Sequence, residues 1–183
     1  MNTIKSFSKI NLAEEVYLDE TLNEEERAAK LEEMGVEICP SCDGNIRIDA
    51  RKSLKTADIK TLPFPGFPTD MQAPFTVLLS TVEGTGIIIE TVFENRFLHI
   101  GELNRMGADI RIDGRASVIE GVRQLSGTSV NAFDLRGGAA LVLAGLVAKG
   151  DTEISGIEHI RRGYEKFIPK LEKIGAKIAL DNQ

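Results

Sequence analysis

The sequence predicts an α/β protein made of repeated βαβαββ units, and two features of the chain predict it. First, the phrase Met-Gly-Val-Glu-Ile within residues 33–38 returns as Met-Gly-Ala-Asp-Ile within 105–110 and as Ile-Gly-Ala-Lys-Ile within 173–178. Second, each phrase follows a helix-like stretch, and its glycine suits the left-handed residue that ends a helix before a strand. Repeats about 70 residues apart indicate one recurring helix–glycine–strand order.

Length, composition and charge limit the class of protein. The 183 residues, 42% of them hydrophobic, suffice for one sizeable core. No apolar run approaches the roughly 18 residues that cross a bilayer, and the start has no apolar signal segment, so we expect a cytoplasmic protein without a membrane partner. The formal net charge of −6 excludes a broad footprint for nucleic acid, so any anion site must be local.

The start of the chain predicts N-terminal strands or a linker over residues 1–22, then part of a unit over 23–50. The apolar residues that favour two short strands are Ile10, Leu12, Val16 and Leu18. A helix is expected over 23–34, and a turn then joins strands over 36–38 and 46–48.

A complete unit is predicted over residues 57–120, because helical spacing of apolar residues alternates with short apolar runs bounded by glycine. In chain order its elements are a strand over 57–60, a helix from Asp70 to Gly84, a strand over 86–90, a helix opened by Arg96, a strand after Gly107 and a strand over 116–120.

A second copy of this order is predicted over residues 128–180. In chain order its elements are a strand over 128–132, a helix from Asp134 to Gly150, a strand over 152–155, a helix opened by Arg162 and a strand after Gly175. The two copies and the partial unit account for the length of the chain.

Equivalent positions of the two copies carry charged residues where helices begin. A helix N-terminus can hold an anion, but position alone favours Asp70 and Asp134 as helix caps. Arg96 and Arg162 follow strand ends, where their side chains would point toward one rim together with Arg136. Converging guanidinium groups suit a phosphate or carboxylate ligand, whereas any one arginine alone fits a solvated salt bridge.

Four segments carry a resemblance to a known family. They are Phe-Pro-Thr-Asp-Met-Gln-Ala (67–73), Glu-Thr-Val-Phe-Glu-Asn-Arg-Phe (90–97), Asp-Leu-Arg-Gly-Gly-Ala-Ala-Leu-Val-Leu-Ala-Gly (134–145) and His-Ile-Arg-Arg-Gly-Tyr-Glu (159–165). In order and spacing they resemble the C-terminal half of the UDP-N-acetylglucosamine 1-carboxyvinyltransferases, the MurA-type enolpyruvyl transferases.

The resemblance implies an inside-out α/β barrel fold, in which each of two domains has three βαβαββ units with inner helices and outer sheets. It implies that residues 23–183 form a C-terminal-type domain whose last unit is completed by the start of the chain. The implied reaction transfers enolpyruvate from phosphoenolpyruvate to the 3-hydroxyl of UDP-N-acetylglucosamine in peptidoglycan synthesis, a step of cell-wall biogenesis, without a cofactor.

The resemblance also implies roles for the matching residues. Asp70 would accept the proton of the sugar 3-hydroxyl as general base, and Asp134 would be a second carboxylate beside the reacting carbons. Val92 would contact the sugar through its backbone.

The matching arginines would serve the other substrate. Arg96 would lie at the cleft, and Arg136 and Arg162 would neutralise the carboxylate and phosphate of phosphoenolpyruvate. A planar guanidinium suits both groups, because it donates two parallel hydrogen bonds.

The family's catalytic domain, with its cysteine loop, has no counterpart in these residues, so we expect no turnover from the chain alone. Cys39 and Cys42 lie far from that motif and fit a turn or a disulfide. A zinc site at these cysteines would need further ligands, for which only His99 and His159 are candidates, so no metal is expected. A homodimer or the missing domain would cover apolar surface left exposed.

Three functions remain open from the sequence. The chain could be the substrate-binding half of an enolpyruvyl transferase. It could be a non-catalytic module that binds a UDP-sugar or a protein, or a folded remnant without a ligand.

Overall fold

The computed structural model describes residues 2–7, 24–40 and 46–182. The strands expected around Ile10 to Leu18 and the turn that contains Cys42 lie outside this range. None of the helices in the described ranges is long and apolar enough to cross a membrane.

One four-stranded sheet is formed by the first complete repeat. Its strands are β4 (Ile59–Lys60), β5 (Thr85–Ile89), β6 (Asp109–Asp113) and β7 (Ala116–Glu120). They lie in the order β4-β5-β7-β6, with β4 parallel to β5 and β7 antiparallel to both of its neighbours. The strand predicted over 116–120 is thereby confirmed.

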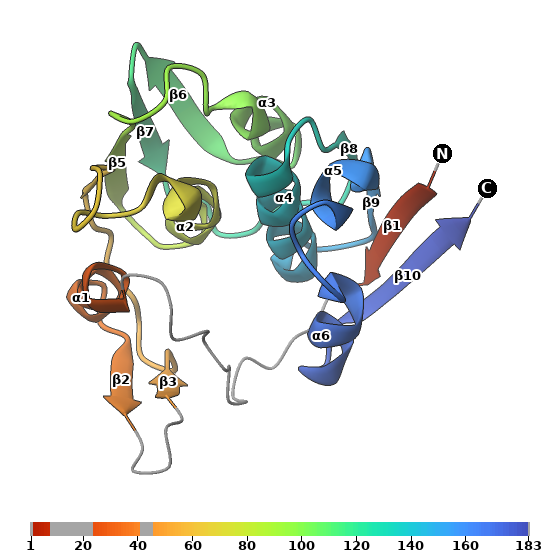
Figure 1. Ribbon diagram of the computed structural model, residues 1–183, viewed down its shortest axis with the longest axis horizontal. Helices are drawn as coiled ribbons and strands as arrows, with labels where there is room; N and C mark the ends of the chain where they lie inside the picture. Colours follow the sequence, from red (N-terminus) through yellow and green to blue (C-terminus); the bar gives the residue numbers. More distant parts are fainter. Residues whose placement is uncertain (1, 8–23, 41–45, 183) are drawn as a thin grey trace.

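The second four-stranded sheet has the same plan but takes one strand from the start of the chain. Its strands are β8 (Ser129–Asn131), β9 (Thr152–Ser155), β1 (Asn2–Phe7) and β10 (Lys177–Asn182). The order is β8-β9-β1-β10, with β8 parallel to β9 and β1 antiparallel to both neighbours. Strand β1 thus occupies the place that β7 has in the first sheet, and the two termini lie side by side (Figure 1).

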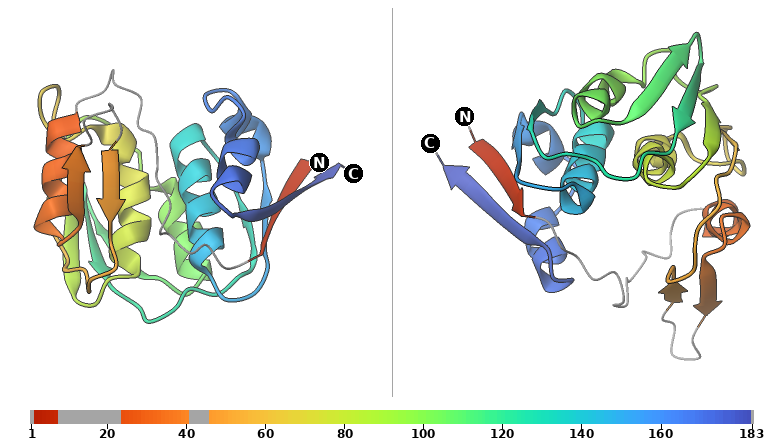
Figure 2. Two further views of the ribbon diagram at one scale, coloured as in Figure 1. Left: turned by 90° about the horizontal axis from the view of Figure 1, so that it is seen from below. Right: turned by 180° about the vertical axis from the view of Figure 1, so that it is seen from behind.

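Four helices lie between these two sheets (Figures 1 and 2). They are α2 (Gln72–Ser80), which a 3₁₀ turn over Thr69–Met71 precedes, α3 (Leu98–Arg105), α4 (Leu135–Val147) and α5 (Ile157–Arg161). Helix α6 (Phe167–Lys173) packs against β10, below α4 in Figure 1. Helix α4 contacts α2, α3 and α5 and buries residues on every side, as the apolar sequence of a central helix requires.

The partial unit comprises helix α1 (Glu24–Glu33) and a hairpin of β2 (Glu37–Pro40) and β3 (Ile46–Asp49), which pair antiparallel. It repeats the order of α3, β6 and β7. Met34 and Val36 are buried where the helix passes into the hairpin.

The glycine of each repeated phrase ends a helix in the predicted way. Gly35, Gly107 and Gly175 all have φ near +90°, at 97°, 90° and 90°. In each case the glycine N–H and the next N–H donate to carbonyls of the preceding helix, for example Ala108 to Leu103 at 3.0 Å. These are the paired bonds of a Schellman motif, so a local signal sets the helix-to-strand turn three times.

One predicted helix start is wrong, and another is shifted by two residues. A short helix, α5, precedes Arg162, so this arginine ends one helix and does not open another. His159 lies within this short helix. Arg96 lies two residues before α3, whose N-cap is Phe97. The other helices and strands predicted within the described ranges are present, with ends shifted by a few residues.

Candidate functional site

An open cavity of about 870 Å³ lies where the helix starts of the two repeats meet. Its lining comes from the first turn before α2, the loop after β5, the start of α3 and the start of α4. The lining residues are Asp70, Val92, Phe93, Glu94, Asn95, Arg96, Leu98, Asp134, Leu135 and Arg136. Five of the six site residues predicted from the sequence therefore share one cavity.

Asp70 stands between two arginines of different repeats. Arg96 Nη2 donates to Asp70 Oδ1 at 2.9 Å, and Arg136 Nη2 donates to Asp70 Oδ2 at 2.6 Å. The carboxylate is 47% exposed and caps no helix, since the N-caps of the 3₁₀ turn and of α2 are Pro68 and Met71. The interpretation of Asp70 as a helix cap is therefore wrong.

This arrangement fixes the protonation state of Asp70. Partial burial acts to raise the pKa of the carboxyl, but the hydrogen bonds and charges of Arg136 and then Arg96 outweigh it, and the pKa is lowered. Asp70 is therefore an anion at neutral pH in the ligand-free site, with both oxygens already engaged.

Each guanidinium is also held on its other side by a hydroxyl and a ring. Arg96 Nη1 donates to Thr69 Oγ1 at 2.7 Å, and its Cζ lies 4.5 Å from the centre of the Phe93 ring. Arg136 Nη1 donates to Tyr164 Oη at 2.8 Å, and its Cζ lies 5.3 Å from that ring centre. The two cations are thus oriented before any ligand arrives.

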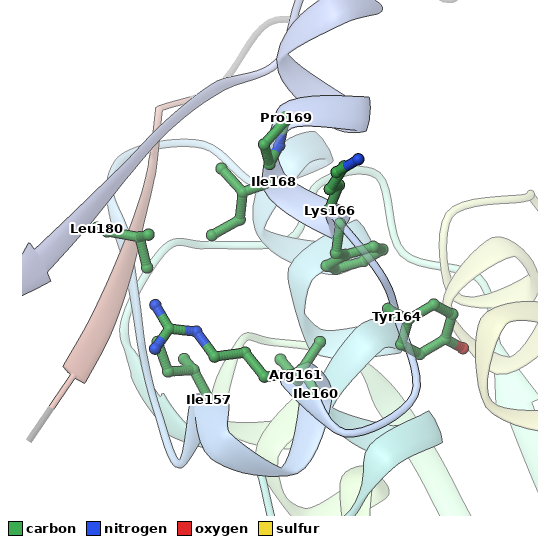
Figure 3. Close-up of a pocket in the computed structure, with 9 residues that line it drawn as sticks. Ile157, Ile160, Arg161, Tyr164, Lys166, Ile168, Pro169 and Leu180 are labelled. Carbon is green, nitrogen blue, oxygen red and sulfur yellow. The ribbon is translucent and has the colours of Figure 1, made fainter.

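Tyr164 connects the site to a second, smaller cavity. Its ring borders a space of about 200 Å³ between α5, α6 and β10, while its hydroxyl points away from that space (Figure 3). The other lining residues are mainly apolar, with Arg161 and Lys166 as the exceptions. This ring packs 4.9 Å from that of Phe167, which fixes the direction of the hydroxyl toward Arg136.

Asp134 is a helix cap, as position alone favours, and it lines the cavity as well. Its Oδ1 accepts a hydrogen bond from the Gly137 N–H at 2.7 Å, at the start of α4. A Cβ at Gly137 would lie 3.0 Å from Asp134 Oδ2 and 3.1 Å from His99 Cβ, so the small residue lets helix and cap approach closely.

His99 lies behind this cap and is only 2% exposed. Its Nε2 has no hydrogen-bond partner among the described residues. Burial lowers the pKa of His99 to about 4, which Asp134 counteracts and Arg96 reinforces. The imidazole is therefore neutral at pH 7. In the described ranges no group of three or more His, Cys, Asp or Glu side chains could hold a metal ion, and Cys39 is exposed and free.

Arg162 does not reach the cavity. It is exposed at the end of α5 and is absent from the residues that line the site. The expected convergence of three guanidinium groups is thus a convergence of two, with the Tyr164 hydroxyl beside Arg136. Helix α5 occupies the residues directly before Arg162, so the loop expected to direct this side chain to the rim is not present there.

Sequence reasoning did not single out Thr69, Glu90 or Tyr164, although each holds a site residue in place. Glu90 had the clearest signal, since a carboxylate directly after the apolar strand 86–89 is an unusual buried group. Thr69 and Tyr164 carry no local signal, because their partners are far along the chain.

Comparison with known proteins identifies the family of this chain. Residues 12–171 match the sequence profile of EPSP synthase (3-phosphoshikimate 1-carboxyvinyltransferase). The chain is 54% identical over 175 residues to UDP-N-acetylglucosamine 1-carboxyvinyltransferase 1 of Clostridium acetobutylicum, covering 95% of this chain and 40% of that protein. It is 58% identical over 151 residues to UDP-N-acetylglucosamine 1-carboxyvinyltransferase 2 of Carboxydothermus hydrogenoformans, covering 82% and 36%.

Solved structures agree on the fold. The enolpyruvyl transferase NikO of Streptomyces tendae matches with a TM-score of 0.77 and 28% identity, over 85% of this chain and 36% of that chain. An EPSP synthase of Acinetobacter baumannii matches with a TM-score of 0.56 and 21% identity, over 75% and 36%. The chain spans about two fifths of the curated relatives it matches. With a family profile matching most of its length and relatives above 50% identity, this chain belongs to the EPSP synthase family of enolpyruvyl transferases, and it resembles part of a UDP-N-acetylglucosamine 1-carboxyvinyltransferase.

Proposed function

We propose that this chain is the substrate-binding half of a UDP-N-acetylglucosamine 1-carboxyvinyltransferase, with residues 23–183 forming its C-terminal-type domain. The single observation that carries the proposal is Asp70 clamped by Arg96 and Arg136 at an open cavity. The reaction between a sugar hydroxyl and a doubly anionic substrate requires a carboxylate that accepts the hydroxyl proton and, close to it, cations that bind the anionic groups.

In the proposed reaction the sugar 3-hydroxyl adds to C2 of phosphoenolpyruvate while a general acid of the complete enzyme gives a proton to C3, and Asp70 accepts the hydroxyl proton. The tetrahedral intermediate carries a methyl group, a carboxylate and a phosphate at C2, and loss of a methyl proton and of inorganic phosphate then gives the enolpyruvyl ether. Arg96 and Arg136 stabilise the two anionic groups. We propose that Val92 contacts the sugar through its backbone and that Asp134 lies beside the reacting carbons.

The ion pairs of Asp70 with Arg96 and Arg136 make the basicity of Asp70 depend on whether phosphoenolpyruvate is bound. Free Asp70 is a weak base, because its two arginine partners lower its pKa. When phosphoenolpyruvate draws the guanidinium groups to its own anionic groups, the carboxylate loses the partners that stabilise its charge. Its basicity then rises at the moment when the sugar hydroxyl is present.

We further propose that the chain has no turnover by itself. Asp70 is nearly half exposed to water, whereas a carboxylate base for an alcohol works in a closed and dry site. The catalytic-cysteine domain of an enolpyruvyl transferase would close the cavity, and Arg162 would reach phosphoenolpyruvate only after α5 moves. These phosphorylated substrates are intracellular metabolites, so the proposed place of action is the cytoplasm and the proposed process is peptidoglycan synthesis.

One observation favours a second function, a UDP-sugar-binding module without catalysis. Both Asp70 oxygens are occupied by guanidinium groups, which makes the carboxylate a better fixed acceptor for a sugar hydroxyl than a base. In this second function the arginines bind the sugar diphosphate, and phosphoenolpyruvate does not bind.

Calorimetric titration of UDP-N-acetylglucosamine, with and without phosphoenolpyruvate, tests these proposals on the 183-residue chain. Binding of both ligands that Arg136→Ala abolishes and Arg123→Ala leaves intact supports the half-enzyme, because Arg123 is exposed outside the cavity lining. Binding of the nucleotide sugar alone supports the module. No binding to the folded chain rejects both.

A further inference from the structure

Glu90 is a buried carboxylate with no positive partner among the described residues. It follows β5, is 1% exposed, and forms no ion pair with any residue in the described part of the chain. Burial of an unpaired charge is costly unless hydrogen bonds replace its water. The hydrogen-bond donors around Glu90 therefore indicate the role of its charge.

One oxygen of Glu90 organises the loop that lines the cavity. Oε1 accepts hydrogen bonds from the backbone N–H groups of Val92 and Phe93 at 2.8 and 3.1 Å, and from Thr61 Oγ1 at 2.8 Å. These bonds fix the backbone of the loop that bears Val92, Phe93 and Arg96. Both backbone N–H groups already donate to Glu90, so neither is available to donate a hydrogen bond to a ligand that contacts this loop.

The other oxygen acts through a hydroxyl on Arg96. Thr69 Oγ1 donates to Glu90 Oε2 at 2.8 Å and accepts from Arg96 Nη1 at 2.7 Å. A hydroxyl has one proton, and a carboxylate can only accept, so the direction of both bonds is determined. Glu90 thereby keeps the lone pairs of Thr69 turned toward the guanidinium.

We propose that Glu90 is a positioning residue, which holds the Arg96 guanidinium and the loop over residues 91–96 in the geometry that grips a ligand anion. Its effect on ligand affinity rests on the proposed function, whereas its effect on Arg96 does not. Two separate readouts therefore distinguish a failure of this inference from a failure of the proposed function.

The first readout needs no ligand. In ¹⁵N NMR spectra of the 183-residue chain, the Arg96 guanidinium signals are expected to be resolved and slow to exchange in the wild type. In Glu90→Gln and Thr69→Val they are expected to average and exchange faster. Thr69→Ser keeps the hydroxyl and is expected to retain the wild-type signals.

The second readout is the dissociation constant of phosphoenolpyruvate. Glu90→Gln and Thr69→Val are each expected to weaken binding about tenfold, since each loosens a charge-assisted hydrogen bond, and the double variant is expected to be no weaker than the worse single one. Glu102→Gln is the matched control: Glu102 is another buried carboxylate that accepts a backbone N–H, from Asn131 at 3.1 Å, but it lies outside the cavity lining. Its affinity is expected to stay within about twofold of the wild type.

Unchanged Arg96 signals in folded Glu90→Gln would overturn the inference, as would an equal loss of affinity in Glu102→Gln. If Glu90→Gln does not fold, Thr69→Val decides by the same criteria. If the wild type binds no phosphoenolpyruvate, the proposed function fails, and the ligand-free NMR comparison still decides the role of Glu90.

Discussion

Replacing Asp70 by asparagine is expected to lower the stability of the chain and to raise its affinity for a small anion. The asparagine amide would accept a hydrogen bond from one of the two guanidinium groups and present an N–H toward the other, so one ion pair is lost and the other becomes a hydrogen bond from a cation to a neutral acceptor. Partly exposed pairs contribute about 0.2–1 kcal/mol each, so the expected loss of unfolding free energy is about 1 kcal/mol. For a chain of this size that corresponds to a fall in Tm of about 2–4 °C.

The gain in anion affinity has the same cause. Asp70 competes with a ligand anion for Arg96 and Arg136, and its own negative charge repels that anion. At a separation of about 5 Å, the repulsion between two unit charges is ~1 kcal/mol at the dielectric constant of water and ~3 kcal/mol at that of a protein surface. The dissociation constant for phosphoenolpyruvate or inorganic phosphate should therefore fall by at least about fivefold at low salt.

Urea unfolding measures the first effect, and calorimetric titration of both anions measures the second. Glu94→Gln is the matched control, because Glu94 lines the same cavity and carries the same charge but is 91% exposed and contacts neither arginine of the clamp. Its effect on anion affinity is expected to be less than about twofold, since water screens an exposed charge. Unchanged or weaker anion binding by folded Asp70→Asn would refute the clamp as a competitor for the ligand.

The remaining predictions concern stability. The folded pKa of His99 is about 4, below its ordinary value of 6.5, so the unfolded chain binds the extra proton first. The contribution of His99 to the free energy of unfolding is complete above pH 6.5 and falls by up to about 3 kcal/mol as the pH decreases to 4. His99→Gln should flatten this pH dependence in urea unfolding measured across that range. A pH dependence equal to that of the wild type would contradict the assignment. The lowered pKa of Asp70 adds a separate loss only below its ordinary value of 3.8, as the pH falls through the folded pKa, and Asp70→Asn should remove that part alone. Gly107→Ala is expected to cost about 1–2 kcal/mol, because φ is +90° there, although a Cβ would meet no atom within 4 Å. Gly101→Ala, inside α3 and equally open, should instead stabilise by up to about 1 kcal/mol, so equal thermal shifts in the two variants would disprove the backbone explanation.

Elements with short-range causes were predictable from the sequence. A glycine at the end of an apolar helical stretch determines its own left-handed turn, and the three phrases all form the same Schellman motif. Asp134 likewise caps the helix that starts beside it. The order of helices and strands within each repeat follows from such signals, which is why the repeat could be predicted from the residues alone, whereas the family was recognised by the resemblance of four segments.

The clamp on Asp70 depended on the tertiary structure. Arg136 lies 66 residues along the chain from Asp70, and only the packing of α2 against α4 brings the two repeats' helix starts together. Position along the chain favours Asp70 as a cap, because capping is a local interaction, whereas the arginine pair is a long-range one. The same limit applies to Glu90, whose partner Thr69 lies 21 residues away.

The sequence by itself determined the repeat, the turns that end its helices and the family to which the chain belongs. The resemblance implied that the start of the chain completes the last unit, but only the tertiary structure decided that β1 lies between β9 and β10. The tertiary structure also decided that Arg162 stands outside the cavity and that Tyr164 lies beside Arg136. The physical reason is range: backbone conformation responds to a few neighbouring residues, while the pairing of a strand or a charge depends on which distant segment packing brings to it.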